Sequence, residues 1–193
     1  MRILFLNASP RKKSFTAMAM REIIKNLSPV HHVDWIDVNF LKLRPCISCL
    51  KCRPDKECVL PPDDGHKTAN MIYDSDALVI GSPTYFGNVT GPLKTLIDRS
   101  LTAFEEIAAS GFEMPVPIHK GQKASIITAC NITAPMSSFP TQGAGALAAM
   151  EIVIKAGGYD LAGSIMVDGA AALTELPSDI KWQAKEIALA LVR

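Results

Sequence analysis

The feature that most constrains the fold is a regular alternation of short apolar runs with longer stretches of helical periodicity. Most of the runs are almost continuously apolar, as is typical of strands buried on both faces of a parallel sheet. Five strands are expected, at residues 2–6, 31–38, 77–81, 124–128 and 164–167. Five helices are expected between and after them, at residues 15–27, 66–73, 91–109, 143–156 and 178–192.

Strands that alternate with helices along the whole chain predict an α/β fold with a doubly wound parallel sheet in three layers. A chain of 193 residues that is 48% hydrophobic can bury one substantial core, so we expect one domain over residues 1–193. One segment is irregular. A Cys-rich insertion at about residues 41–65 replaces most of the crossover helix between the second and third strands. It follows the carboxyl end of a strand, where open α/β sheets bind ligands.

Charge and hydropathy exclude several classes of partner. The formal net charge is +1, from 20 basic and 19 acidic residues, which gives no field to attract nucleic acid or an anionic membrane. The sequence contains no run of 18 or more apolar residues, which is about the length needed to span a bilayer. The first apolar run, residues 3–6, is too short for a signal peptide, so we expect a cytoplasmic protein. Five cysteines in a reducing compartment favour thiols or metal ligands over disulfides.

The loop after the first strand, NASPRKKSFT at residues 7–16, suits a phosphate group. It combines the hydroxyls of Ser9, Ser14 and Thr16 with Arg11 and with backbone N–H groups at a helix N-terminus. It is neither a Walker A loop nor a G-x-G-x-x-G loop. A polar turn whose serines only cap the helix remains an alternative.

The loop after the third strand, GSPTYFGNVTGPLK at residues 81–94, lies beside the first loop at the predicted switch point of the sheet. Tyr85 and Phe86 offer aromatic surface, and Gly87 and Asn88 offer amide donors. Such a wall suits a flat heteroaromatic ring with hydrogen-bonding edges. The alternative is an ordinary strand-to-helix turn with two buried aromatic side chains.

Together, NASPRKKSFT and GSPTYFGNVTGPLKTLIDR resemble the flavodoxin-like, NAD(P)H-dependent FMN reductases. The resemblance implies a sheet of order 2-1-3-4-5, bound FMN, NAD(P)H as co-substrate, and a homodimer or homotetramer. The implied phosphate ligands are Ser9, Arg11, Ser14, Phe15 (through its backbone) and Thr16. The implied contacts to the flavin ring are Pro83, Thr84, Tyr85, Phe86, Gly87 and Asn88 on one side and Thr128, Ala129 and Cys130 on the other.

Two positions depart from the pattern of this family. Ala8 stands where a glycine is common, and the third loop has no glycine before Gly143. The third loop, residues 131–142, is also long for a compact domain, and long loops are commonly functional.

Four cysteines of the insertion follow the spacing C-x2-C-x2-C-x5-C: Cys46, Cys49, Cys52 and Cys58. Three cysteines at i, i+3 and i+6 let a tight loop wrap three corners of a metal cluster, and the fourth completes the thiolate set. Structural zinc usually takes two C-x2-C knuckles that lie further apart, and fits less well.

The compact spacing resembles the iron–sulfur flavoproteins, a branch of the same family. In that branch four such cysteines hold a [4Fe–4S] cluster near FMN, so the resemblance implies that these four are the ligands. Cluster-free reductases of the family also keep a cysteine-rich segment here, which ends in a cysteine, an apolar residue and a nearby Asp-Asp pair. This chain has the same ending, with Cys58, Val59, Asp63 and Asp64. The presence of the cluster stays open.

The sequence therefore favours an FMN-dependent oxidoreductase that passes electrons from NAD(P)H through FMN to an acceptor such as a quinone or free flavin. One alternative is an iron–sulfur flavoprotein that exchanges single electrons with a ferredoxin-like partner. Another is a regulatory or interaction module in which a metal bound by the four cysteines has a purely structural role. Cys130, at the end of a buried strand, is expected to be a small core residue rather than a metal ligand. Asp98 and Arg99 are interpreted as an exposed ion pair.

Overall fold

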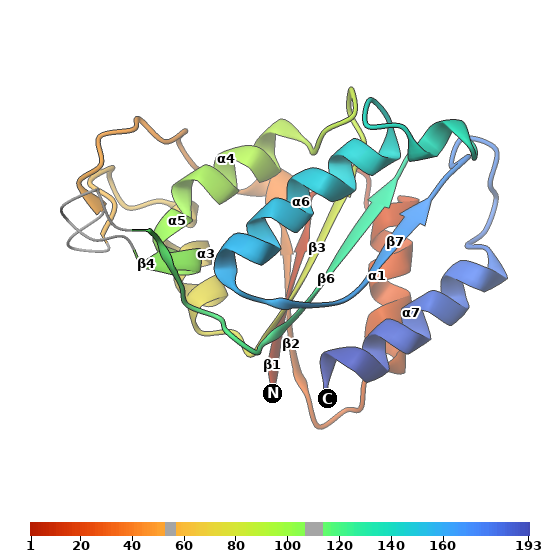
Figure 1. Cartoon of the computed structure of the whole chain (residues 1–193), viewed down its shortest axis with the longest axis horizontal. Coiled ribbons are helices and arrows are strands. Elements are labelled where there is room, and N and C mark those ends of the chain that lie inside the picture. The colour runs from red at the N-terminus through yellow and green to blue at the C-terminus, as the bar shows by residue number, and fades with distance from the viewer. Residues whose placement is uncertain (53–56, 107–113) are drawn as a thin grey trace.

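The computed structural model describes residues 1–52, 57–106 and 114–193 (Figure 1). Five parallel strands form one sheet in the order β2-β1-β3-β6-β7. The strands are β1 (Arg2–Asn7), β2 (His32–Asp37), β3 (Ala77–Pro83), β6 (Lys123–Ala129) and β7 (Asp160–Val167). These are the five strands expected from the sequence, in the order 2-1-3-4-5, so the flavodoxin-like fold is confirmed.

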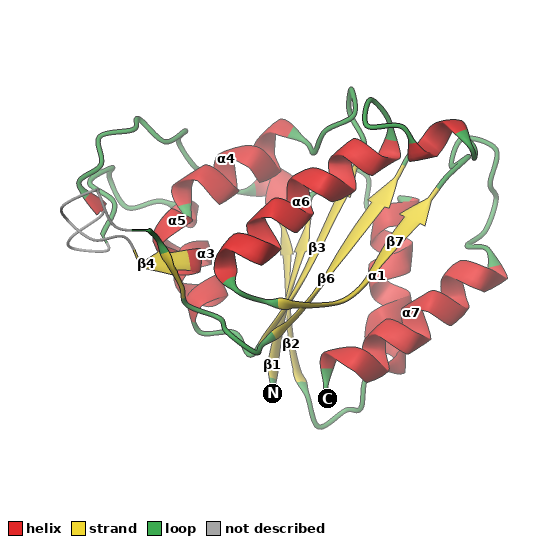
Figure 2. Ribbon diagram, in the orientation of Figure 1, coloured by secondary structure: helices red, strands yellow, loops and turns green. Residues whose placement is uncertain are grey.

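Helices cover both faces of the sheet and make three layers (Figure 2). One face carries α1 (Phe15–Asn26) and α7 (Ser178–Leu191). The other carries α3 (Asp64–Tyr73), α4 (Gly91–Arg99), α5 (Leu101–Phe104) and α6 (Gly143–Gly157). Successive strand residues point to opposite faces, so β1 contributes Ile3 and Phe5 to the core under α1 and α7 and Leu4 and Leu6 to the core on the other side.

The single helix expected over residues 91–109 is wrong in that it is interrupted at Ser100 and gives way to a strand at Glu105. Helix α4 ends at Arg99, because Ser100 leaves helical geometry at φ −103° and ψ 18°. The single turn of α5 follows, and then β4 (Glu105–Glu106) pairs antiparallel with β5 (Val116–Pro117). Residues 107–109 of the expected helix lie outside the described residues.

Strand β7 begins at Asp160, four residues before the expected start at Ser164. Its first half pairs with β6 although most of its side chains are at least partly exposed. As the outermost strand of the sheet, β7 needs no continuous apolar run there. Two short 3₁₀ turns, η1 (Val38–Phe40) and η2 (Met136–Ser138), complete the described elements.

The N- and C-termini lie at one end of the sheet, and the carboxyl ends of the strands point to the other (Figure 1). The loops after β1, β3, β6 and β7 therefore meet at one edge. In the described part of the chain, no helix has both the length and the apolar character needed to cross a bilayer.

Candidate functional site

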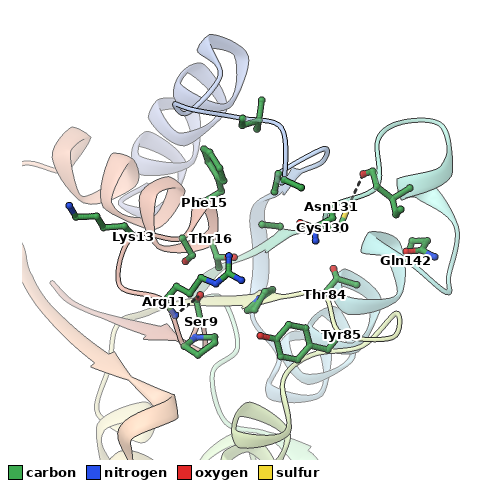
Figure 3. Close-up of a pocket in the computed structure, with 18 of the residues that line it drawn as sticks. Ser9, Arg11, Lys13, Phe15, Thr16, Thr84, Tyr85, Cys130, Asn131 and Gln142 are labelled. Atoms are coloured by element: carbon green, nitrogen blue, oxygen red, sulfur yellow. Dashed lines mark hydrogen bonds between the residues drawn. The ribbon is translucent and has the colours of Figure 1, made fainter.

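A cavity of about 710 Å³, called the edge cavity below, opens at the carboxyl edge of the sheet (Figure 3). This volume lies within the range of roughly 300–1,000 Å³ found for small-molecule and cofactor sites. Most of the flavin contacts expected from the sequence line it: Ser9, Arg11, Ser14, Phe15, Thr16, Pro83, Thr84, Tyr85, Phe86, Ala129 and Cys130. Residues from three separate loops thus meet around one space.

The start of α1 presents unused hydrogen-bonding groups to the edge cavity. Ser14 is the N-cap, and its side chain accepts from the amide of Ala17 at 3.1 Å. The amides of Phe15 and Thr16 precede the first helical hydrogen bond, from Met18 N to the carbonyl of Ser14, so no earlier helical turn offers them an acceptor. Thr16 Oγ1 is buried and has no hydrogen-bond partner. The capping-turn alternative accounts for Ser14 but leaves the buried Thr16 hydroxyl unsatisfied.

Polar contacts from β2 hold the first residues of this loop. Asp37 Oδ1 accepts from Asn7 Nδ2 at 2.7 Å and from Trp35 Nε1 at 2.8 Å, and Asn7 Oδ1 accepts from the amide of Ser9 at 3.2 Å. Ala8 is fully buried, with its methyl group in the core. The fold thus accommodates alanine where the family commonly has glycine.

Two basic side chains of the first loop point in different directions. Arg11 extends toward Thr16, whereas Lys13 points away from the other labelled side chains (Figure 3). Arg11 is therefore the cation placed to meet an anion at the start of α1.

The loop after β3 forms a tight turn that presents two aromatic rings. Tyr85 and Asn88 exchange backbone hydrogen bonds of 2.9 and 3.0 Å around Phe86 and Gly87. Both central residues have positive φ, 50° and 70°, as a type I′ turn requires. The Phe86 side chain is fully exposed and that of Tyr85 is half exposed. The alternative of two buried aromatic residues is therefore wrong, and a non-glycine residue in this strained region is a frequent mark of functional sites.

Three expected contacts support the cavity wall instead of lining it. Thr128 is buried, and its hydroxyl donates to the carbonyl of Ser82 at 2.8 Å and lies 3.0 Å from Thr84 Oγ1. Asn88 Oδ1 accepts from the amide of Val89 at 2.8 Å. Gly87 packs so closely on residues 140–141 that an added Cβ would lie 2.7 Å from the backbone carbon of Thr141.

The loop after β6 reaches the edge cavity despite its lack of glycine. The carbonyl of Ala129 accepts from the amide of Thr84 at 2.9 Å, which joins this loop to the previous one. Cys130 is buried, and its thiol donates to the carbonyl of Ile132 at 3.3 Å. Burial raises the pKa of this thiol, as suits the core residue that was expected.

Further residues of the first and third loops also line the cavity: Pro10, Lys13, Asn131, Ile132 and Gln142. Sequence reasoning missed the loop after β7, which contributes Ala170, Ala171 and Leu173. Asp168, just past β7, ties this last loop to the third one: its Oδ2 accepts from the amide of Ala134 at 2.7 Å and from the Ser137 hydroxyl at 3.2 Å. The predicted topology indicates that the loop after β7 also reaches this site, because all five parallel strands end at the same edge of the sheet.

The four cysteines of the insertion share a second cavity of about 170 Å³, called the thiol cavity below, against the junction of α4 and α5. All four are free thiols; Cys46 and Cys49 are exposed, and Cys52 and Cys58 are half buried. Burial and then the other three cysteines raise the pKa of Cys52. As soft thiolate donors around one space, they fit an iron–sulfur cluster by chemistry. Over residues 1–52, 57–106 and 114–193, however, no three Cys, His, Asp or Glu side chains lie close enough together to hold a metal ion.

The interpretation of Asp98 and Arg99 as an exposed ion pair is wrong. Asp98 pairs instead with Lys94 on α4. The Arg99 side chain is only 1% exposed and binds Asp63 through both terminal nitrogens, at 2.9 and 3.1 Å. No local sequence pattern indicates this contact, because the partners are 36 residues apart.

Asp63 is the N-cap of α3, and its side chain accepts from the amide of Gly65 at 3.0 Å. Burial alone would raise the pKa of Asp63, but hydrogen bonds from Arg99, the amide of Arg44 and His66 hold it well below its usual range. The carboxylate is therefore ionised at neutral pH and balances the buried guanidinium.

Comparison with known proteins identifies the family of this chain and several relatives. The sequence profile described as NADPH-dependent FMN reductase matches residues 1–111. An iron-sulfur flavoprotein of Archaeoglobus fulgidus is 38% identical over 105 residues, which cover 53% of this chain and 50% of that protein. One of Methanocaldococcus jannaschii is 31% identical over 101 residues, 52% of each chain. The chain thus spans about half the length of the curated relatives it matches.

Solved structures share the fold at low sequence identity. An azoreductase of Bacillus anthracis str. Sterne superposes with a TM-score of 0.74 at 15% identity, over the full length of both chains. An NAD(P)H:quinone oxidoreductase of Methanothermobacter marburgensis superposes with a TM-score of 0.66 at 20% identity, covering 98% of this chain and 94% of that one. At such identities the likeness establishes the flavodoxin-like architecture alone.

Proposed function

The chain belongs to the NADPH-dependent FMN reductase family, and from this premise we propose that it is an FMN-dependent oxidoreductase. In this proposal electrons pass from NAD(P)H through FMN to a small acceptor such as a quinone or free flavin. The observation that carries the proposal is the buried Thr16 hydroxyl, which has no partner and lies at the start of α1 in the edge cavity.

The first loop binds the phosphate end of FMN. The Thr16 hydroxyl, the amides of Phe15 and Thr16 and the helix dipole of α1 all favour an anion at this point. Arg11 adds a guanidinium, and Ser9 and Ser14 add hydroxyls at the same wall. A phosphate here satisfies a buried polar group that the protein alone leaves unpaired.

The second and third loops hold the ring end of FMN. The exposed rings of Tyr85 and Phe86 offer flat apolar surface, and Ala129 and Cys130 close the cavity from β6. Thr128 keeps Thr84 in place through their hydroxyl contact. When bound, FMN supplies hydride acceptance and onward electron transfer, while the protein orients the ring and excludes water.

The test is purification under anaerobic conditions, release of flavin on denaturation, and bleaching of the bound flavin by NADPH and NADH in turn. We expect yellow protein that either nicotinamide bleaches and a quinone reoxidises. Arg11→Ala should weaken FMN binding at least tenfold, whereas Lys12→Ala, which removes an exposed cation of the same loop that does not line the cavity, should change it little. A colourless protein that does not bind added FMN would contradict the proposal.

A second candidate function is favoured by the four free thiols around the thiol cavity. Here a [4Fe–4S] cluster on Cys46, Cys49, Cys52 and Cys58 and FMN exchange single electrons with a ferredoxin-like partner. The relatives named iron-sulfur flavoproteins support it. Iron and sulfide assays test the cluster. Flavin that reduced ferredoxin bleaches and NAD(P)H does not would establish the carrier role; metal without flavin would favour the regulatory module.

Two further expectations stay predictions. The family resemblance implies a homodimer or homotetramer, which light scattering on the purified protein tests. The cytoplasmic location is tested by cell fractionation.

A further inference from the structure

One buried ion pair anchors both ends of the Cys-rich insertion. At its start, Arg44 donates its amide to Asp63 Oδ2 at 3.1 Å, and its carbonyl accepts from Arg99 Nη1 at 2.7 Å. At its end, His66 Nε2 donates to the carbonyl of Cys58 at 3.2 Å, and its Nδ1 lies 3.0 Å from Asp63 Oδ1 and 3.2 Å from the amide nitrogen of Asp63. The first and last cysteines therefore take their positions from the pair formed by Asp63 and Arg99.

One nitrogen atom of Arg99 has no hydrogen-bond partner among the described residues. Its two terminal nitrogens bind Asp63 and the carbonyl of Arg44, but Nε is buried and has no hydrogen-bond partner in the described part of the chain. A buried guanidinium N–H without an acceptor is costly and rare. Arg99 also lines the thiol cavity with all four cysteines. An acceptor on the cysteine side would satisfy the unpaired Nε.

The cation at this position is stable. Burial alone would lower the pKa of Arg99, but the hydrogen bond to Asp63 and the neighbouring Cys58 raise it. Cys58 is thus a thiol with which the guanidinium interacts. A thiolate sulfur accepts a hydrogen bond from a cation more strongly than a neutral thiol does.

We propose that Arg99 is a positioning residue of an iron–sulfur centre on the four cysteines, where its Nε–H donates to the Cys58 sulfur and stabilises the reduced state. The inference rests on the second candidate function. Hydrogen bonds to the sulfurs and net charge nearby set the reduction potential of such centres. A guanidinium that donates to a ligand sulfur favours the state with the extra electron.

The experiment is a redox titration of the whole protein, reconstituted anaerobically with iron and sulfide and followed by electron paramagnetic resonance. Arg99→Met should make the potential of the centre more negative, with the reduced-to-oxidised ratio falling about tenfold at a fixed potential, about 59 mV for one electron. Asp63→Asn removes a negative charge and keeps Arg99, so it should shift the potential the opposite way. Lys185→Met, which removes an exposed cation from α7 on the other face of the sheet, is the control and should leave it unchanged.

Opposite shifts in the two variants support the role, because a loosened loop would move both variants in the same direction. Equal potentials in wild type and Arg99→Met, or shifts of the same sign in both, overturn it. If Arg99→Met does not fold, Arg99→Lys replaces it: the lysine keeps the charge without Nε, and an unchanged potential also overturns the role. Wild type that holds no iron and sulfide overturns this inference and the carrier function together, while flavin bleaching by NAD(P)H still decides the oxidoreductase proposal.

Discussion

The edge cavity and the thiol cavity differ in what holds their walls in place. The walls of the edge cavity continue directly from β1, β3 and β6, whose central residues are fully buried. Residues 41–51 and 57–63 of the Cys-rich insertion belong to no helix or strand, so no such element positions Cys46, Cys49 or Cys58. The ends of the insertion depend instead on the polar contacts of Asp63 and Arg99.

The difference teaches that a site built on strand ends takes its rigidity from the sheet, whereas a site on an insertion needs specific anchors. Apolar burial responds little to pH, but an anchor made of an ionised pair does. The two cavities have no lining residue in common among those described. A substitution at one site should therefore leave the other site unaffected.

The largest expected effect is at the anchor of the insertion. Asp63→Asn leaves the buried Arg99 cation without its carboxylate, which should cost about 3 kcal/mol of unfolding free energy. Chemical denaturation of both proteins at pH 7 measures it. FMN affinity should stay within about twofold of wild type, since Asp63 is not part of the edge cavity; a large loss of affinity would show that the two sites are coupled.

The Asp63 carboxylate also makes the stability of the protein depend on pH. Because the pKa of Asp63 is depressed in the folded protein, its stabilisation is present above its unfolded pKa of about 3.9 and is lost as pH falls through the folded value. Melting temperature between pH 5 and pH 2 should fall less steeply in Asp63→Asn than in wild type. Parallel curves would contradict the assignment.

A somewhat smaller effect is expected where the second and third loops of the edge cavity interlock. A Cβ on Gly145 would overlap the carbonyl oxygens of Pro140 and Gly87. Gly145→Ala should destabilise the protein by about 2 kcal/mol and weaken FMN binding, because backbone must move. Gly91→Ala is the matched control, since an added Cβ meets nothing within 4 Å there. Titration of both variants with FMN checks the prediction, and equal affinities would contradict it.

Thr16→Val separates stability from binding. Removal of a buried, unpaired hydroxyl should stabilise the flavin-free protein by about 1 kcal/mol and weaken FMN binding about tenfold. Ser125→Ala removes another buried hydroxyl without a partner, in β6 and outside the cavity lining, and should leave FMN affinity unchanged. Wild-type affinity in Thr16→Val would remove the phosphate assignment.

The smallest effect is expected at the aromatic turn. Phe86→Gly relieves a left-handed residue at φ 50° and should stabilise the flavin-free protein by at most about 1 kcal/mol. Loss of the ring should weaken FMN binding a few-fold. Leu50→Gly, at φ 61° in the insertion, should give a similar gain in thermal stability with no change in FMN binding. If both variants weaken FMN equally, the ring of Phe86 has no part in binding.

Sequence reasoning was most accurate where the signal is local. The apolar runs of the five sheet strands and the capping role of Ser14 come from neighbouring positions along the chain. It failed at Ser100, where the backbone leaves helical geometry although the helical pattern of the sequence continues. It also missed the loop after β7, whose small residues Ala170 and Ala171 carry no chemical signature of a ligand wall.

The sequence by itself determined the α/β class, the two loops that frame the edge cavity and the four cysteines as one group, because periodicity and spacing are properties of short stretches. Only the tertiary structure decided that Arg99 is buried on Asp63 and that Thr16 keeps an unpaired hydroxyl. It also decided that Gly145 packs on Gly87. These contacts depend on how distant segments approach in space, and the burial that gives each its energy exists only once the layers have packed.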